Sequence, residues 1–135
     1  MIASWERADD AQGRHWVSRI LIAGQDWQAR ALLRAQLLEE EFEVEAHEAI
    51  SEALATLPSS TDLPDLLIAD ISASDYPSAD VEALSAWSRK LPIWIIASRT
   101  YIVEKGLRGH GFEVILLRPV DVGELVDQIK RRLER

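Results

Sequence analysis

Residues 66–70 read Leu-Leu-Ile-Ala-Asp, four consecutive apolar residues that end at a carboxylate. A short apolar run without alternation is typical of a strand that is buried on both faces of a parallel sheet. The residues after such a strand lie at the carboxyl edge of the sheet, where α/β proteins bind their ligands. Asp70 is therefore the first candidate for a functional residue, although an aspartate in this place also commonly caps the following turn.

Short apolar runs like that of residues 66–70 recur along the chain, and segments with helical spacing of apolar residues lie between them. We predict further buried strands over 19–23, 93–97 and 114–117, and a half-buried edge strand over 42–46, where apolar and acidic residues alternate. Helices are expected from Trp27 toward Phe42 and over 50–57, 81–88, 102–107 and 121–133. Strands that alternate with helices predict a single α/β domain over 18–135, with a parallel sheet and helices on both faces, and an N-terminal arm over 1–17.

The first predicted helix has a clear start and an apolar stripe. Asp26 precedes it in the position of an N-terminal cap. The apolar residues that repeat at helical spacing are Ala31, Leu32, Ala35, Leu38 and Phe42.

Charge is distributed unevenly along the 135 residues. The formal net charge is −8, yet residues 39–82 contain 13 acidic and no basic residues, so the rest of the chain is net basic. A net acidic chain is a poor nucleic-acid binder by itself. Cysteine is absent, which excludes a disulfide framework and a cysteine zinc site. No apolar run approaches the ~20 residues of a membrane span, so we expect no membrane partner. The absence of cysteine fits a reducing cytoplasm, and we expect a cytoplasmic protein.

Several segments, taken in order and spacing, carry a resemblance to a known family. They are Arg19–Ala23, Arg30 with Leu32-Leu33, Pro64–Asp70, Leu91-Pro92-Ile93, and Gly111 seven residues before Arg118-Pro119. Over Arg19 to Leu133 the chain resembles the receiver domain of bacterial two-component response regulators. The resemblance implies the CheY-like, flavodoxin-like fold: a doubly wound, five-stranded parallel sheet of order 2-1-3-4-5.

The same resemblance assigns a phosphoacceptor position to Asp70, which a histidine kinase would phosphorylate. In the family, an acidic pair after the first strand holds Mg²⁺, and a hydroxyl and a lysine after the fourth and fifth strands bind the phosphoryl oxygens. Here Gly24 and Gln25 stand at the acidic pair, Ala97 at the hydroxyl and Arg118 at the lysine. Asp26 and Ser98 each lie one residue past the matching position. Because Arg118 keeps the positive charge in a forked form, we expect it to pair with Asp70.

These departures imply an atypical receiver, or pseudo-receiver. We expect it to act by protein–protein interaction without phosphorylation, catalytic activity, metal or cofactor. Two alternatives stay open: a phosphoacceptor at Asp70 with a degraded Mg²⁺ site, and a small-molecule binder on a flavodoxin-like fold. The expected partner face is formed by the fourth helix, fifth strand and fifth helix, and would bind an acidic protein surface or a second copy. Its basic residues are Lys105, Arg108, Lys130, Arg131 and Arg132. We expect the acidic and basic segments to lie on opposite edges of the sheet.

Overall fold

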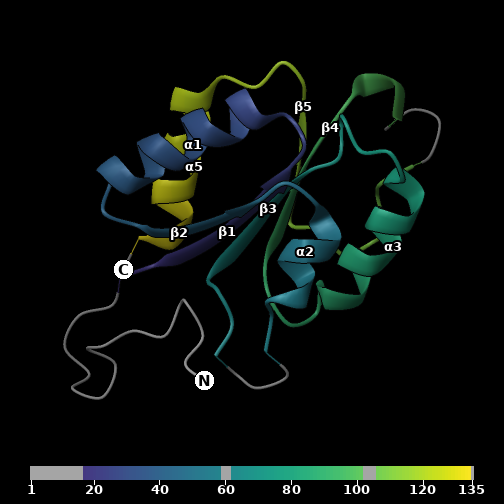
Figure 1. Cartoon of the computed structure of the whole chain (residues 1–135), viewed down its shortest axis with the longest axis horizontal. Helices are drawn as coiled ribbons and strands as arrows, with labels where there is room; N and C mark the ends of the chain where they lie inside the picture. The colour runs from purple at the N-terminus through teal and green to yellow at the C-terminus, as the bar shows by residue number, and fades with distance from the viewer. Residues whose placement is uncertain (1–16, 59–61, 102–105, 135) are drawn as a thin grey trace.

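Five short strands form one parallel sheet in the computed structural model, which describes residues 17–58, 62–101 and 106–134 (Figure 1). The strand order is β2-β1-β3-β4-β5, and every neighbouring pair is parallel, as predicted. The strands are β1 (Arg19–Gly24), β2 (Glu43–His47), β3 (Leu66–Asp70), β4 (Ile93–Ala97) and β5 (Val114–Leu117).

Two layers of helices cover the sheet. Figure 1 shows α1 and α5 on one side of the sheet, and α2 and α3 on the other. Alternate residues of each strand pack against the two helix layers, because successive side chains of a strand point to opposite faces of the sheet. In β1, for example, Ile20 and Ile22 pack in the α1–α5 half of the core, whereas Leu21 and Ala23 pack in the other half. The helices are α1 (Trp27–Glu39), α2 (Ile50–Ala55), α3 (Pro77–Trp87) and α5 (Val122–Leu133).

Burial of the strands follows their place in the sheet. Every residue of β1 and β4 is buried, and only the last residue of β3, Asp70, is partly exposed. The edge strands β2 and β5 are half-buried throughout. Continuous apolar runs mark the three central strands, but the run over 114–117 forms the edge strand β5, which is half-buried and not buried as predicted. The strand β2 begins one residue later than predicted.

Two predicted segments fall largely outside the described residues. Of the helix expected over 102–107, residues 102–105 are not described, and Gly106 and Leu107 are not helical, while residues 99–101 form a helical turn. Residues 1–16 of the expected arm also lie outside the described part. Among the helices of the described residues, none has the length and apolar character to cross a membrane.

The apolar residues that repeat at helical spacing in α1 do not mark its buried face. Leu33 and Leu37 are the buried residues of this helix, whereas Leu32 and Leu38 are largely exposed. The buried side also carries Arg30, whose guanidinium donates a hydrogen bond to the carbonyl oxygen of Gly24. Because α1 carries apolar residues on two faces, helical periodicity alone could not identify the one that meets the sheet.

Candidate functional site

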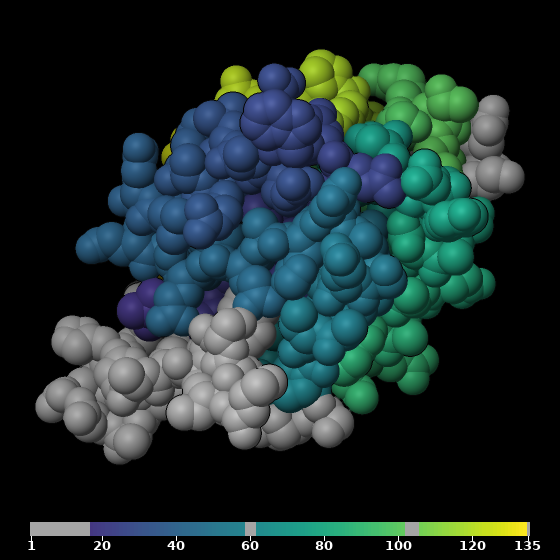
Figure 2. Space-filling model, viewed as in Figure 1, coloured from purple at the N-terminus to yellow at the C-terminus, as the bar shows by residue number. Residues whose placement is uncertain are grey.

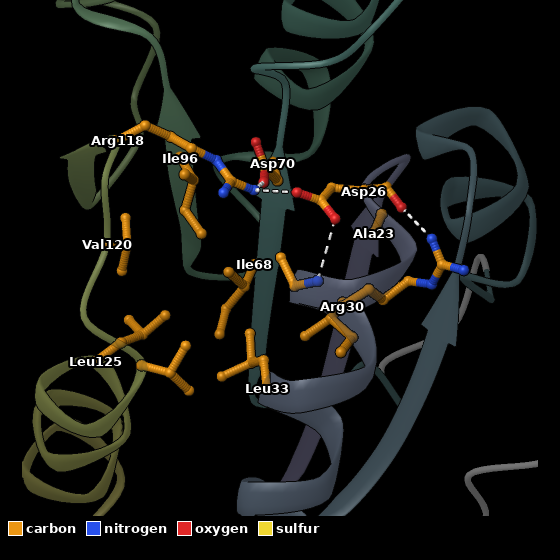
Figure 3. Close-up of a pocket in the computed structure, with 14 residues that line it drawn as sticks. Ala23, Asp26, Arg30, Leu33, Ile68, Asp70, Ile96, Arg118, Val120 and Leu125 are labelled. Atoms are coloured by element: carbon orange, nitrogen blue, oxygen red, sulfur yellow. Dashed lines mark hydrogen bonds and ion pairs between the residues drawn. The ribbon is translucent and has the colours of Figure 1, made fainter.

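Residues from three loops meet at the carboxyl edge of the sheet (Figure 3). Gly24 ends β1 and lies beside Asp70, the last residue of β3, in the sheet register. The approach is close, because a Cβ added at Gly24 would lie 3.0 Å from the Cβ of Asp70. Arg118 follows β5 and is held there by its backbone N–H, which donates to the carbonyl oxygen of Ala97 at 3.0 Å.

Both carboxylate oxygens of Asp70 are engaged. Oδ1 accepts hydrogen bonds from the backbone N–H and the hydroxyl of Ser72, at 2.9 and 2.5 Å. Oδ2 accepts a hydrogen bond from Nη2 of Arg118, which confirms the expected pairing. The side chain of Asp70 is only 13% exposed, so this charge is satisfied mainly by protein donors rather than by water.

Arg118 connects three segments of the site. Besides its ion pair with Asp70, its Nε donates to the hydroxyl oxygen of Ser72 at 3.0 Å, and its Nη2 lies 3.7 Å from Oδ2 of Asp26. The forked guanidinium can make the two hydrogen bonds at once because its Nε–H and Nη2–H bonds lie side by side in one plane. The side chain is 32% exposed, so one side of the guanidinium still faces solvent.

Ser72 also belongs to this cluster, although it was not among the residues predicted from the sequence. It lies two residues after Asp70, and the hydrogen bond from its backbone N–H to the carboxylate is the contact that defines an Asx turn. A hydroxyl residue two positions after a strand-ending aspartate is therefore the signal that could have identified it. Its hydroxyl donates to Asp70 and accepts from Arg118.

The neighbouring candidates have local structural contacts. The carboxylate of Asp26 caps α1 by accepting from the N–H of Ala29 at 3.2 Å, as expected. Ala97 is buried and offers no hydroxyl. The hydroxyl of Ser98 accepts from the N–H of Tyr101 at 3.1 Å, a contact with the helical turn that follows β4. Ser98 therefore does not replace the missing hydroxyl at Asp70.

The residues present do not fit the Mg²⁺ ion of the family that the sequence resembles. Mg²⁺ binding relies on one or two carboxylates with free oxygens. Gly24 has no side chain, Gln25 has no charge, and Asp70 directs its oxygens to Ser72 and Arg118. Within the described ranges, no group of three or more histidine, aspartate or glutamate side chains could hold a metal.

A small apolar cavity lies beneath Arg118 (Figure 3). Its volume is about 50 Å³, and aliphatic side chains from β1, β3, β4, α1 and α5 form most of its wall. Asp26, Arg30, Asp70 and Arg118 also line it. Sites for drug-sized ligands enclose about 300–1,000 Å³, so this cavity gives little support to the small-molecule alternative.

The basic residues of the expected partner face are partly used within the molecule. Nζ of Lys130 lies 2.9 Å from Oε1 of Glu40. The guanidinium of Arg132 donates from Nε and Nη2 to the carboxylate of Glu113, at 2.5 and 3.0 Å. The bond to Glu40 raises the pKa of Lys130, and the bond from Arg132 lowers the pKa of Glu113.

The ion pair between Lys130 and Glu40 corrects the predicted separation of charge. Because α1 lies beside α5, the acidic end of α1 meets the basic end of α5, and the two charged segments do not lie wholly on opposite edges. Arg108 and Arg131 are exposed, whereas Lys105 lies outside the described residues.

The chain matches known proteins in structure, whereas comparisons of its sequence find no match. No protein-family model matches the chain, and no curated protein matches it. Among solved structures, a CheY-like receiver domain from Methanospirillum hungatei JF-1 is similar at a TM-score of 0.73 and 21% identity, over 88% of this chain and 95% of that one. The HemR receiver domain of Leptospira biflexa has a TM-score of 0.71 and 22% sequence identity, over 87% of this chain and 95% of that one. The chemotaxis response regulator CheY4 of Vibrio cholerae has a TM-score of 0.71 and 20% sequence identity, over 87% of this chain and 100% of that one. The chain therefore has the fold of the CheY-like response regulator receiver domains.

Proposed function

We propose that this chain is a signalling module that acts by protein–protein interaction and does not depend on phosphorylation of Asp70. It works without a cofactor and catalyses no reaction of its own. The observation that carries the proposal is the cluster of Asp70, Ser72 and Arg118, in which the acceptor-position carboxylate is already paired with a guanidinium.

Phosphoryl transfer to this carboxylate faces a cost before any chemistry starts. The attacking oxygen would have to be released from Arg118 or from Ser72. Hydrogen bonds to charged groups contribute about 1.5–3 kcal/mol, which corresponds to a factor of about 10 to 150 in the population of the free carboxylate. The donor is anionic, and Gly24 and Gln25 provide no carboxylates to hold a cation between it and Asp70.

The same cluster supports a role in recognition. Arg118 links the segments after β1, β3 and β5 through Asp26, Asp70 and Ser72. The loops at the carboxyl edge of the sheet are thus connected by ion pairs and hydrogen bonds within the protein, and this needs no phosphoryl group. A partner protein can therefore meet this surface in one arrangement at all times.

A phosphorylation assay tests the proposal. The protein is incubated with Mg²⁺ and acetyl phosphate and its intact mass is measured. Binding of beryllofluoride is followed by the fluorescence of Trp27, which is two residues from Gln25 and largely exposed. The indole of Trp94 is a poorer reporter, because its Nε1 donates to Glu113 at the other end of β5. We expect no mass increase and no saturable fluorescence change.

Two variants make the assay decisive. Asp70→Asn sets the baseline, and a wild-type mass gain of one phosphoryl group that Asp70→Asn lacks would support the phosphoacceptor alternative instead. Gln25→Asp/Arg118→Lys restores one carboxylate and removes the forked guanidinium, so it should accept the phosphoryl group more readily than the wild type. Gly24 is left unchanged in this variant, because a side chain there would press against Asp70.

A further inference from the structure

An open groove lies between the end of α3 and the loop that leads into β5, and its volume is about 680 Å³. Because its two walls shortly precede β4 and β5, the groove lies at the amino edge of the sheet, at the opposite end from Asp70. Figure 2 shows the end of α3 and the residues after it (green) at the surface of the molecule. We call this feature the α3 groove and define it by Glu82, Ser85, Ser88, Arg89 and residues 109–111.

The two walls of the α3 groove are in direct contact. The hydroxyl of Ser85 on α3 donates a hydrogen bond to the carbonyl oxygen of His110 at 2.9 Å. Gly111 lies so close to the end of α3 that a Cβ added there would be 2.5 Å from Oγ of Ser88. The ring of His110 also stacks on Phe112, with the ring centroids 5.9 Å apart. The α3 groove is therefore formed before any ligand binds, which lowers the entropic cost of binding.

The α3 groove is locally basic, although the formal net charge of the chain is −8. Arg89 lines the groove, and Arg108 directly precedes the loop that forms its other wall. Both side chains are exposed, and in the part of the chain that the structure describes neither takes part in an ion pair or a hydrogen bond. Glu82 is the one carboxylate among the residues that line the groove, and no described residue from 83 to 112 is acidic. The two guanidinium groups are therefore available to an acidic ligand.

The charge changes along the α3 groove, and this limits the ligand that fits it. Glu82 and Arg89 are seven residues apart, which is about 10 Å along the end of α3. An extended chain rises about 3.3 Å per residue, so a segment of about three residues spans that length. Carboxylates are favoured beside Arg89 and disfavoured beside Glu82. The groove thus fits a short acidic run whose carboxylates lie at the Arg89 end.

We propose that the α3 groove binds a short, extended acidic segment of a partner protein. A carboxylate can accept two parallel hydrogen bonds from one guanidinium, so exposed arginines suit this contact. A nucleic acid is a less suitable ligand, because its phosphates would continue past the groove onto the surface of a net acidic chain. The protein occupant rests on the proposed function, in which the chain acts by binding another protein.

Fluorescence anisotropy of a labelled peptide of six glutamates tests the groove. The peptide is titrated with the full chain at about 0.15 M salt, where the Debye length is about 8 Å and acidic side chains on other surfaces are screened. We expect saturable binding, and no binding of the same label on a peptide of six serines. Equal signals from the two peptides would overturn the proposal.

Charge reversal shows whether the α3 groove is where the peptide binds. Arg89→Glu and Arg108→Glu should each weaken binding about three-fold or more, as expected when an exposed ion pair is replaced by a like-charge contact. Glu82→Gln should tighten binding, because it removes the one carboxylate of the groove. Arg34→Glu and Arg131→Glu, on the exposed sides of α1 and α5, change the net charge equally and should leave the affinity nearly unchanged. Circular dichroism verifies that all variants fold. An equal loss in the two control variants would contradict binding in the groove.

Two further measurements separate this groove from the Asp70 site and from a nucleic-acid site. Asp70→Asn, at the opposite edge of the sheet, should bind the glutamate peptide as the wild type does, and a loss there would count against the groove. Phosphorylation of Asp70 is measured by mass and peptide binding by anisotropy, so either proposal can fail alone. A single-stranded DNA with six phosphates should bind more weakly than the peptide. Tighter binding of the DNA would refute the assignment of a protein segment.

Discussion

Replacing Arg118 by methionine removes the guanidinium from Asp70 while it preserves most of the aliphatic stem that lines the cavity below. Asp70 is 13% exposed, so the carboxylate cannot regain full hydration. It would retain only the two hydrogen bonds from Ser72. The variant therefore leaves a largely buried charge without a counter-ion, which is among the more destabilising changes available to a protein.

The size of the effect lies between two measured limits. Exposed ion pairs contribute about 0.2–1 kcal/mol, and breaking a fully buried pair costs about 3–5 kcal/mol. Because Arg118 is 32% exposed and Asp70 is mostly buried, we expect Arg118→Met to lower the free energy of unfolding by about 2 kcal/mol. Asp70→Asn should cost less, about 1 kcal/mol, because Arg118 keeps Ser72, Asp26 and water as partners.

A double-mutant cycle isolates the pair. The free energy of unfolding is measured by urea denaturation at pH 7 for the wild type, both single variants and Arg118→Met/Asp70→Asn. We expect a coupling energy of about 1 kcal/mol, since residues in direct contact are not independent. Arg131→Met, an exposed arginine on α5, is the control and should change stability by less than about 0.5 kcal/mol. A coupling below about 0.5 kcal/mol, or a larger loss for Asp70→Asn than for Arg118→Met, would refute the reasoning.

Two further predictions concern stability away from the site. The bond from Arg132 lowers the pKa of Glu113 below its usual 4.5, so its contribution to stability is present above that pH and is lost as the pH falls through the folded-state pKa. The stability difference between wild type and Glu113→Gln should accordingly shrink in urea titrations below pH 4.5. Gly111 has a φ of 89°, and a Cβ there would lie 2.5 Å from Oγ of Ser88. Gly109 has a similar φ, but a Cβ there would meet open space. Gly111→Ala should therefore lower the midpoint of thermal unfolding more than Gly109→Ala does.

The sheet was largely predictable because its central strands are buried on both faces. Burial leaves an uninterrupted apolar run such as 66–69, and the order of these runs and helices gives the topology. The edge strand β2 was predicted one residue early, because the apolar Phe42 was counted as part of the strand. It follows the turn that ends α1 and packs beside the core rather than pairing in the sheet.

The site was predictable in part. The pairing of Arg118 with Asp70 was expected because the matching positions of a known family placed both at the carboxyl edge, and opposite charges at that distance attract. Ser72 was not found, because its contribution depends on the backbone turn after β3 and not on a spacing that the family comparison covers. The hydrogen bond of Ser98 to the next helical turn likewise depends on local geometry.

The buried face of α1 could not be identified from the helical period alone. A helix with a single apolar face gives one solution to the helical period, whereas α1 carries Leu33 and Leu37 toward the sheet and Leu38 and Ala31 toward solvent. The helical period therefore fits two sets of residues in α1, and the structure shows which set meets the sheet.

The residues around Asp70 are coupled by electrostatics. Positions 24 and 25 carry no carboxylates, and the mostly buried carboxylate of Asp70 needs a positive partner. An ammonium group at position 118 could bond Asp70 as a point charge, but the guanidinium also presents Nε to Ser72 in the same plane. Arg118→Lys should consequently retain part of the ion pair and lose the bond to Ser72. Arg118 thus supplies the counter-ion of Asp70.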